Sequence, residues 1–137
     1  MTKNDFKPVV LLVDDSDQDA SLFVSALDDV NQDVACQVCS SGKEAEEWLQ
    51  QGNRADFGLV DVRLGSEDGF KVAGRLARYI SEGDKAIILW TGDPEGWPNA
   101  DKRWALRGKP YDLQALRDLA TEIASRAQAA FDQFAAQ

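Results

Sequence analysis

Short runs of apolar residues alternate along the chain with segments in which apolar residues recur every three or four positions. The short runs predict strands, and their nearly unbroken apolar character is typical of strands that are buried on both faces of a parallel sheet. The expected strands span residues 8–13, 34–39, 57–60, 86–90 and 104–107, of which the last has the weakest pattern. This alternation predicts an α/β protein whose parallel sheet is covered by helices on both faces.

The segments of helical periodicity predict four helices. Ser16 is the expected N-cap of the first, because a hydroxyl side chain there can accept a hydrogen bond from the first turn. The second is expected over residues 43–50, and the third has an apolar face that runs from residue 70 to residue 80. The last is expected from Asp112 to about Phe134, which makes it unusually long.

The connection between the fourth and fifth strands is unusual. Residues 92–104 contain Pro94 and Pro98, and a proline in a helix interior costs about 3 kcal/mol. We therefore expect the helix between these two strands to be missing or cut to about one turn. Residues 63–67, after the third strand, are expected to form a loop.

Length and composition agree with a single domain over residues 1–137, with a core of about 8–125 and a helical extension of about 126–137. The net charge of −9 argues against binding to nucleic acid or to anionic membranes. The apolar runs are all shorter than a membrane span of about 20 residues. The N-terminus lacks the apolar stretch of a signal peptide, so we expect a cytoplasmic protein.

Cys36 and Cys39 stand in a C-x-x-C spacing. We interpret them as two structural thiols within a strand, because a redox pair of this kind needs a turn at a helix N-terminus. The sequence contains no histidine, which removes the commonest general base and the commonest zinc ligand from the candidate chemistry.

Polar residues stand directly after the predicted strands. Asp14 and Asp15 follow the first strand, Asp61 the third, Thr91 the fourth and Lys109 the fifth. In open α/β sheets the ligand site lies beyond the carboxyl ends of the strands, so we expect these side chains to converge. Three neighbouring carboxylates need a cation, and Mg²⁺ prefers such oxygen ligands. A lysine and a hydroxyl can bind phosphoryl oxygens, so the set suits phosphoryl transfer, in which an aspartate can be the nucleophile.

The sequence resembles the receiver domains of two-component response regulators over roughly residues 8–125. The resemblance rests on four motifs that occur in order after strand ends, namely LLVDDSD, LVDVRLGSEDG, ILWTGD and RGKPYD. It implies a flavodoxin-like, doubly wound fold of five parallel strands in the order 2-1-3-4-5. It also implies a signalling function that depends on a phosphoryl group.

The resemblance implies roles for the acidic residues of these motifs. Asp61 would accept the phosphoryl group. Asp14, Asp15 and Asp61 would hold Mg²⁺, and the backbone carbonyl of Arg63 would be a further ligand.

The resemblance also assigns roles beyond the acidic cluster. Lys109 would bind a phosphoryl oxygen, Thr91 would move toward the phosphoryl group, and Gly92 would leave room for it. The peptide bond before Pro110 would be cis. Receivers usually place an aromatic residue three positions before the lysine as a partner of the threonine, and this position is Leu106 here. The chain therefore departs from the family pattern at this position.

Two hypotheses concern the altered segment. Arg63 and Asp93 occupy two positions that, in the family, affect how fast water removes the phosphoryl group. An ion pair between them would shield the site and slow this hydrolysis. Trp90, Trp97 and Trp104 would cover sheet surface that the missing helix leaves bare, with ordinary core packing as the alternative.

The leading functional hypothesis is a single-domain response regulator that takes a phosphoryl group from a histidine kinase or a His-containing phosphotransfer protein. It would catalyse only its own phosphorylation and dephosphorylation and would signal through contact with a downstream protein. The first alternative is a receiver-like binding module that never uses phosphate, and the second is a Mg²⁺-dependent phosphatase with an aspartyl-phosphate intermediate.

Phe131 and Phe134 indicate a homodimer or partner contact on the last helix, with a frayed alanine-rich tail as the alternative.

Overall fold

The computed structural model describes residues 6–98 and 100–136. Its main element is a five-stranded sheet in the order β2-β1-β3-β6-β7, in which all neighbouring strands are parallel. The five strands are β1 (Val9–Val13), β2 (Ala35–Cys39), β3 (Phe57–Asp61), β6 (Ile87–Thr91) and β7 (Ala105–Gly108). The expected order 2-1-3-4-5 is confirmed, because β6 and β7 are the fourth and fifth strands of this sheet.

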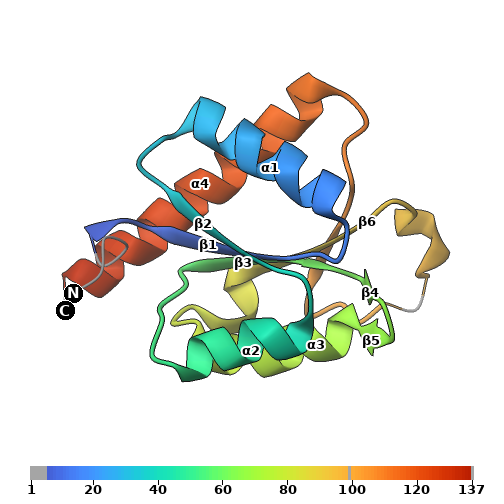
Figure 1. The fold of residues 1–137 in the computed structure, drawn as a ribbon, viewed down its shortest axis with the longest axis horizontal. Coiled ribbons are helices and arrows are strands. Elements are labelled where there is room, and N and C mark those ends of the chain that lie inside the picture. The colour runs from blue at the N-terminus through green and yellow to red at the C-terminus, as the bar shows by residue number, and fades with distance from the viewer. Residues whose placement is uncertain (1–5, 99, 137) are drawn as a thin grey trace.

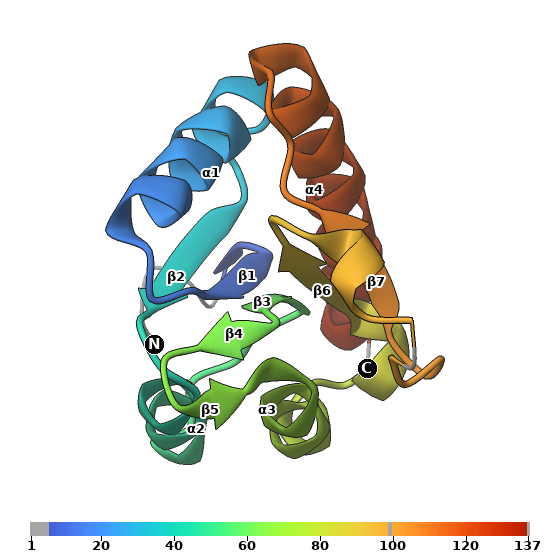
Figure 2. The same cartoon turned by 90° about the vertical axis from the view of Figure 1, so that its right-hand side faces the viewer.

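The α-helices form two layers, one on each face of the sheet (Figure 1). α1 (Asp17–Val30) and α4 (Leu113–Ala135) cover one face, and α2 (Gly42–Gln50) and α3 (Gly69–Leu76) cover the other, as the second view also shows (Figure 2). All residues of β1, β3 and β6 are buried between these layers. The long apolar runs of the sequence follow from this position, since a central strand of such a sheet has no solvent-facing side.

Each α-helix begins at a side-chain cap. Ser16, Ser41, Asp68 and Asp112 each accept a hydrogen bond from a backbone N–H in the first turn of the helix that follows. Such caps satisfy N–H groups that have no partner within the helix itself. The predicted N-cap Ser16 is thus confirmed, and it fixes the short turn between β1 and α1.

The third helical segment is shorter than its apolar pattern indicates. α3 ends at Leu76 and continues as a 3-10 turn, Ala77–Tyr79. Ile80 is still buried, but it lies beyond the helix in extended conformation. A second 3-10 turn, Gly83–Ala86, leads from there into β6.

The predicted loop after β3 contains regular structure. β4 (Arg63–Leu64) and β5 (Glu67–Asp68) pair as a small antiparallel hairpin. Gly65 has a φ of 61° at the turn, a conformation that glycine adopts without steric cost. The hairpin carries the chain from Asp61 to the start of α3.

The connection from β6 to β7 has no α-helix in its described residues. It contains one 3-10 turn, Pro94–Gly96, in which proline occupies the start and Asp93 accepts a hydrogen bond from the Gly96 N–H. The prediction of a missing or one-turn helix is therefore confirmed. Its physical reason is the one read from the sequence, since proline is tolerated at the start of a turn and not in a helix interior.

The three tryptophans near this connection do not act as one group. The Trp90 ring packs edge-on against Phe23 of α1, with 5.8 Å between ring centres, so Trp90 belongs to the core beneath α1. The hypothesis of a shared cover for the bare surface is therefore wrong for this residue. Trp97 lies against Phe70 of α3 at 5.8 Å, and Trp104 is buried in the core.

The last helix is as long as predicted. It begins after the cap Asp112 and runs for 23 residues, so the C-terminal extension is helical and not frayed as far as Ala135. The rings of Phe131 and Phe134 each lie 5.0 Å from the Arg54 guanidinium carbon, in a cation–π arrangement. The extension thus contacts its own domain, while Phe134 is still 45% exposed.

Cys36 and Cys39 are free thiols. Burial raises the pKa of Cys36 to about 12 and the pKa of Cys39 to about 11. Both therefore stay protonated at neutral pH, which agrees with structural thiols and not with a redox-active thiolate.

Within residues 6–98 and 100–136, no helix is long and apolar enough to cross a membrane. The prediction about a signal peptide concerns the N-terminal segment, and residues 1–5 of that segment lie outside the described residues.

Candidate functional site

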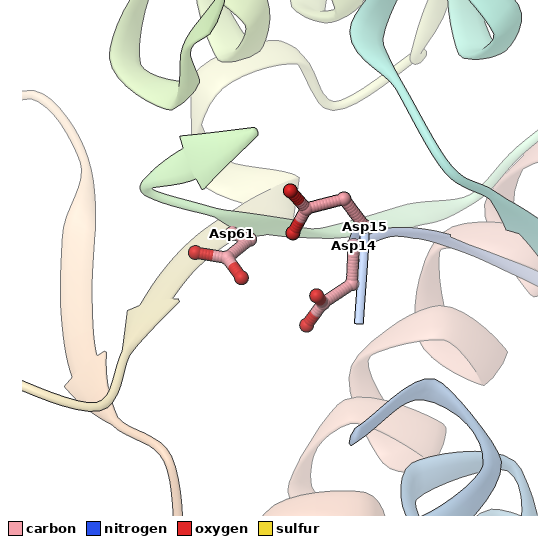
Figure 3. Close-up of side chains that lie close together, drawn as sticks. All are labelled: Asp14, Asp15 and Asp61. Carbon is pink, nitrogen blue, oxygen red and sulfur yellow. The ribbon is translucent and has the colours of Figure 1, made fainter. Parts of the chain in front are cut away.

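Three acidic side chains meet at the carboxyl ends of β1 and β3 (Figure 3). Asp14 and Asp15 follow the last residue of β1, and Asp61 is the last residue of β3, the neighbouring strand. Each of the three offers one oxygen, and these oxygens lie within 4.8 Å of one another. The structure therefore brings together the three carboxylates that the sequence placed after strand ends, because parallel strands end at one edge of the sheet.

Lys109 reaches this cluster from the end of β7. Its backbone N–H donates to the carbonyl of Thr91 at 2.7 Å, which extends the pairing of β6 and β7 by one residue. Its side-chain nitrogen Nζ lies 3.0 Å from Asp14 Oδ2, 2.8 Å from Asp61 Oδ2 and 2.7 Å from Asp19 Oδ2. One ammonium group thus contacts three carboxylates.

The two oxygens of Asp14 have different surroundings. Oδ1 accepts a hydrogen bond from the Ser16 backbone N–H at 2.8 Å. The buried Oδ2 accepts none from the residues that the structure describes, although Lys109 Nζ lies 3.0 Å away. Burial raises the pKa of Asp14 to about 6; Ser16 and Lys109 favour the carboxylate without offsetting burial, and the charge of Asp61 adds to the rise.

Lys109 is held in its charged form. Burial alone would lower its pKa, but hydrogen bonds to Asp19 and Asp61, together with the nearby carboxylate of Asp14, outweigh burial and raise the pKa above its ordinary value. Nζ also lies 5.1 Å above the ring of Trp90, within cation–π distance. The ammonium therefore has a defined place between the acidic cluster and the core.

The cluster fits a hard divalent cation. Its donors are carboxylate oxygens, which Mg²⁺ prefers, and the buried Asp14 Oδ2 is an acceptor without a hydrogen bond in the described part of the chain. Asp15 is exposed, so one side of the cluster is open to solvent and to ligands. The carboxylates that contact Lys109 carry more charge than its ammonium, and a divalent cation would compensate the excess.

Thr91 and Gly92 lie at the same edge of the sheet. Thr91 ends β6 and is 6% exposed, and its Oγ1 accepts a hydrogen bond from the Asp93 N–H at 3.2 Å. Gly92 is exposed, and a side chain there would meet no atom within 4 Å. The surface beside the threonine is therefore open.

The peptide bond before Pro110 is trans, because the described residues contain no cis peptide bond. The expectation of a cis bond, which came from the family motif alone, is wrong. Even before proline the trans form is favoured by about 0.5–1 kcal/mol, so a cis bond occurs only where a turn imposes it. Here the chain runs from Pro110 to Asp112, the cap of α4.

The hypothesis of an ion pair between Arg63 and Asp93 is also wrong for the described residues. The guanidinium carbon of Arg63 lies 5.2 Å from the Trp97 ring, and the carboxylate of Asp93 caps the turn at Pro94–Gly96. Each side chain thus has another partner in the altered segment. Leu106 is half-buried in β7, opposite Leu89.

Two contacts at the site were not predicted. Asp19 of α1 accepts a hydrogen bond from Lys109 Nζ, a residue 90 positions away in the sequence. The crowding of Asp14, Asp15, Asp17 and Asp19 was the only signal of it, and a charge run usually indicates a solvated face. The exposed Tyr111 donates from its hydroxyl to the Gly92 carbonyl at 2.9 Å, and the sequence contained no signal for that contact.

The family model described as the response regulator receiver domain matches residues 10–96. The match includes Asp14, Asp15, Asp61 and Thr91 and ends within the altered connection, before Lys109. No curated protein matches the chain.

Solved structures of receivers share the fold. The signal receiver domain of an HD domain-containing protein from Pseudomonas fluorescens Pf-5 has a TM-score of 0.67 at 19% identity, over 90% of this chain and 91% of that chain. The Mn²⁺-bound form of response regulator Rcp1 has a TM-score of 0.66 at 21% identity, over 86% and 92%. The phosphorylated cyanobacterial phytochrome response regulator RcpA has a TM-score of 0.64 at 19% identity, over 85% and 91%. These likenesses show the flavodoxin-like receiver fold.

Proposed function

Because the chain belongs to the response regulator receiver domain family, we propose that Asp61 accepts a phosphoryl group from a histidine kinase or a His-containing phosphotransfer protein. An oxygen of the Asp61 carboxylate attacks phosphorus and forms an O–P bond. The N–P bond of the donor breaks, and its electron pair stays on the donor imidazole. Receiver domains are signalling modules, so we expect the phosphoryl group to change contacts with a downstream protein and not to serve turnover.

The observation that carries this proposal is the position of Lys109. Its Nζ lies 2.8 Å from Asp61 Oδ2 and 3.0 Å from Asp14 Oδ2, so the candidate acceptor already shares an ammonium with the acidic cluster. An ammonium beside the nucleophile can bind an oxygen of the incoming group and so orient it. Thr91 supplies a hydroxyl at the same edge, and Gly92 leaves the approach open.

We propose that Asp14, Asp15 and Asp61, with the backbone carbonyl of Arg63, hold Mg²⁺. When bound, the cation neutralises charge on the phosphoryl oxygens. The close set of three carboxylate oxygens supports this assignment. The Mn²⁺-bound form of Rcp1 supports it as well, since that protein with the same fold holds a divalent cation.

A phosphate-independent binding module is the second candidate. It is favoured by Leu106, which stands where receivers usually have an aromatic residue, and by the connection without an α-helix in its described part. A homodimer through the C-terminal helix stays a prediction, for which Phe134 offers an exposed ring. Cytoplasmic location is likewise part of the proposal.

The test is intact-mass analysis after incubation with phosphoramidate or acetyl phosphate, with and without Mg²⁺. The parent protein is compared with Asp61→Asn and with Asp33→Asn, which changes an exposed aspartate away from the cluster. We expect a gain of one phosphoryl group in the parent and in Asp33→Asn, only with Mg²⁺, and no gain in Asp61→Asn. An equal gain in Asp61→Asn would disprove the acceptor assignment, and no gain from either donor in a folded parent would favour the binding module.

A further inference from the structure

Asp19 is a fourth carboxylate at the site, and it comes from a different element. It lies in the first turn of α1, where Ser16 caps the helix by accepting from the Asp19 backbone N–H. Its Oδ2 accepts from Lys109 Nζ at 2.7 Å, the shortest of the three contacts of that nitrogen. The side chain is 37% exposed, whereas that of Asp14 is fully buried, so Asp19 lies on the solvent side of the ammonium.

The three contacts of Lys109 are not equivalent for phosphoryl transfer. An ammonium has three N–H donors, and here three carboxylates surround it. Asp14 and Asp61 belong to the group of oxygens that fits a cation, and Asp19 does not. A cation in that group would therefore compensate Asp14 and Asp61 and leave Asp19 as a full negative charge paired with Lys109.

An incoming phosphoryl group must share Lys109 with this partner. Its oxygens are anionic acceptors like the carboxylate of Asp19, and they need the same N–H donors. Asp19 also adds a negative charge at the exposed side of the site, where a small anionic donor approaches. Both effects act against the reaction of Asp61 with such donors.

We propose that Asp19 is a positioning residue that holds Lys109 on the α1 side of the site and thereby slows phosphorylation of Asp61 by small phosphodonors. This inference rests on the function proposed above. It assigns to α1 a control of the reaction rate, in addition to its packing against the sheet.

The test compares phosphorylation rates of the parent and of Asp19→Asn with acetyl phosphate and Mg²⁺. We expect the variant to react about 2- to 5-fold faster, because a partly exposed ion pair competes weakly but measurably. Asp19→Glu should react at the parent rate, since glutamate keeps the charge and can reach Lys109. Asp17→Asn is the matched control: Asp17 lies in the same helical turn, is exposed, and does not contact Lys109 in the described residues.

Ionic strength distinguishes the direct contact of Asp19 with Lys109 from general repulsion between Asp19 and the anionic donor. Salt at about 1 M shortens the Debye length to about 3 Å, so it suppresses repulsion across the site mouth more than a direct contact. We expect Asp19→Asn to stay faster than the parent in high salt and Asp17→Asn to match the parent. A ratio that falls to one for Asp19→Asn in high salt would overturn the contact mechanism.

A second readout needs neither metal nor phosphate. In the metal-free parent, the ion pairs of Lys109 should slow exchange of its ammonium protons enough to give a ¹⁵Nζ NMR signal, and Asp19→Asn should weaken or remove that signal. If the parent is phosphorylated and Asp19→Asn reacts no faster, the role of Asp19 is disproved but the proposed function is not. A failure of both proteins to take up phosphate would disprove the proposed function and this inference together, whatever the NMR signal shows.

Discussion

Asp14 is the residue of the site whose buried charge is most clearly unfavourable. Its carboxylate is buried, and Oδ2 has no hydrogen bond from the residues that the structure describes. A buried charge with incomplete compensation destabilises the folded state. The residue is therefore expected to serve a ligand at some cost to the stability of the metal-free protein.

The first prediction is that Asp14→Asn stabilises the metal-free protein by about 1 kcal/mol at neutral pH, because it removes this charge and keeps the oxygen that Ser16 contacts. Urea unfolding in the presence of a chelator measures the change. Asp33→Asn, at an exposed position, should alter the free energy of unfolding by less than about 0.5 kcal/mol. A loss of stability in Asp14→Asn would show that Lys109 compensates the carboxylate fully.

The second prediction concerns pH. Burial raises the pKa of Asp14 from 3.8 to about 6, so between these values the folded protein binds a proton that the unfolded chain releases. Stability from this group is present below the unfolded pKa and is lost as the pH rises through the folded pKa. The advantage of Asp14→Asn over the parent should therefore be small near pH 3.5, below the unfolded pKa, and full near pH 7.5, as measured by urea unfolding at both values. An advantage that does not change with pH would contradict the raised pKa.

At the residue scale, the sequence could predict the members of the site that stand at strand ends. Asp14, Asp15, Asp61 and Lys109 follow strands, and the parallel sheet brings strand ends together whatever the loops do. It could not predict the contact of Asp19 with Lys109, because that contact depends on how the tertiary fold places the first turn of α1 relative to Lys109, which follows β7. The cis form of the peptide bond before Pro110 was predicted from a motif, but the form of that bond depends on local chain geometry.

At the scale of elements, the close approach of α3 to β3 fixes the backbone under Asp61. A Cβ added to Gly69, the first residue of α3, would lie 2.1 Å from the Asp61 carbonyl oxygen and 2.7 Å from Val62 Cα. Gly69 also donates to the Val62 carbonyl at 2.8 Å. The glycine is therefore required by the approach of two backbones and not by an unusual φ.

The third prediction compares two glycines of this helix. Gly69→Ala should destabilise the protein by about 2–3 kcal/mol, because the backbone must move to admit the methyl group. Gly74→Ala should stabilise it by about 0.5–1 kcal/mol, since a methyl group there would meet no atom within 4 Å and alanine favours helix. Thermal or urea unfolding of both variants checks this pair, and similar effects of the same sign would contradict it.

Elements were predictable where one local signal dominates. The prolines in residues 92–104 correctly predicted the loss of a helix, and serine and aspartate caps marked helix starts. The end of α3 at Leu76 was not predictable from periodicity, because a 3-10 turn continues the same apolar face. The hairpin of β4 and β5 is too short for an alternating pattern to indicate it.

At the scale of the whole molecule, the net charge of −9 makes any cation stabilising to some degree. A test for a Mg²⁺ site must therefore distinguish specific binding from general screening of the protein's negative charge. Binding at ten times the dissociation constant stabilises a folded protein by about 1.4 kcal/mol, independently of the rest of the charge.

The fourth prediction is that Mg²⁺ raises the thermal midpoint by about 3–6 °C at saturation, beyond the effect of NaCl at equal ionic strength. Asp15→Asn should lose most of the specific gain, because it removes the exposed ligand of the cluster. Asp33→Asn should keep it. Equal shifts with the two salts in the parent would show that the cluster does not bind Mg²⁺ selectively.

The position of Trp90 beneath the Lys109 ammonium, 5.1 Å from Nζ, equips the protein with an optical reporter. Indole emission responds to the electric field at the ring, so any ligand that moves this ammonium alters the fluorescence of Trp90. The chain has four tryptophans, and replacement of Trp48, Trp97 and Trp104 by phenylalanine would leave this one alone. Stopped-flow fluorescence of such a protein would then follow events at the site in real time, without a dye or a radioactive donor.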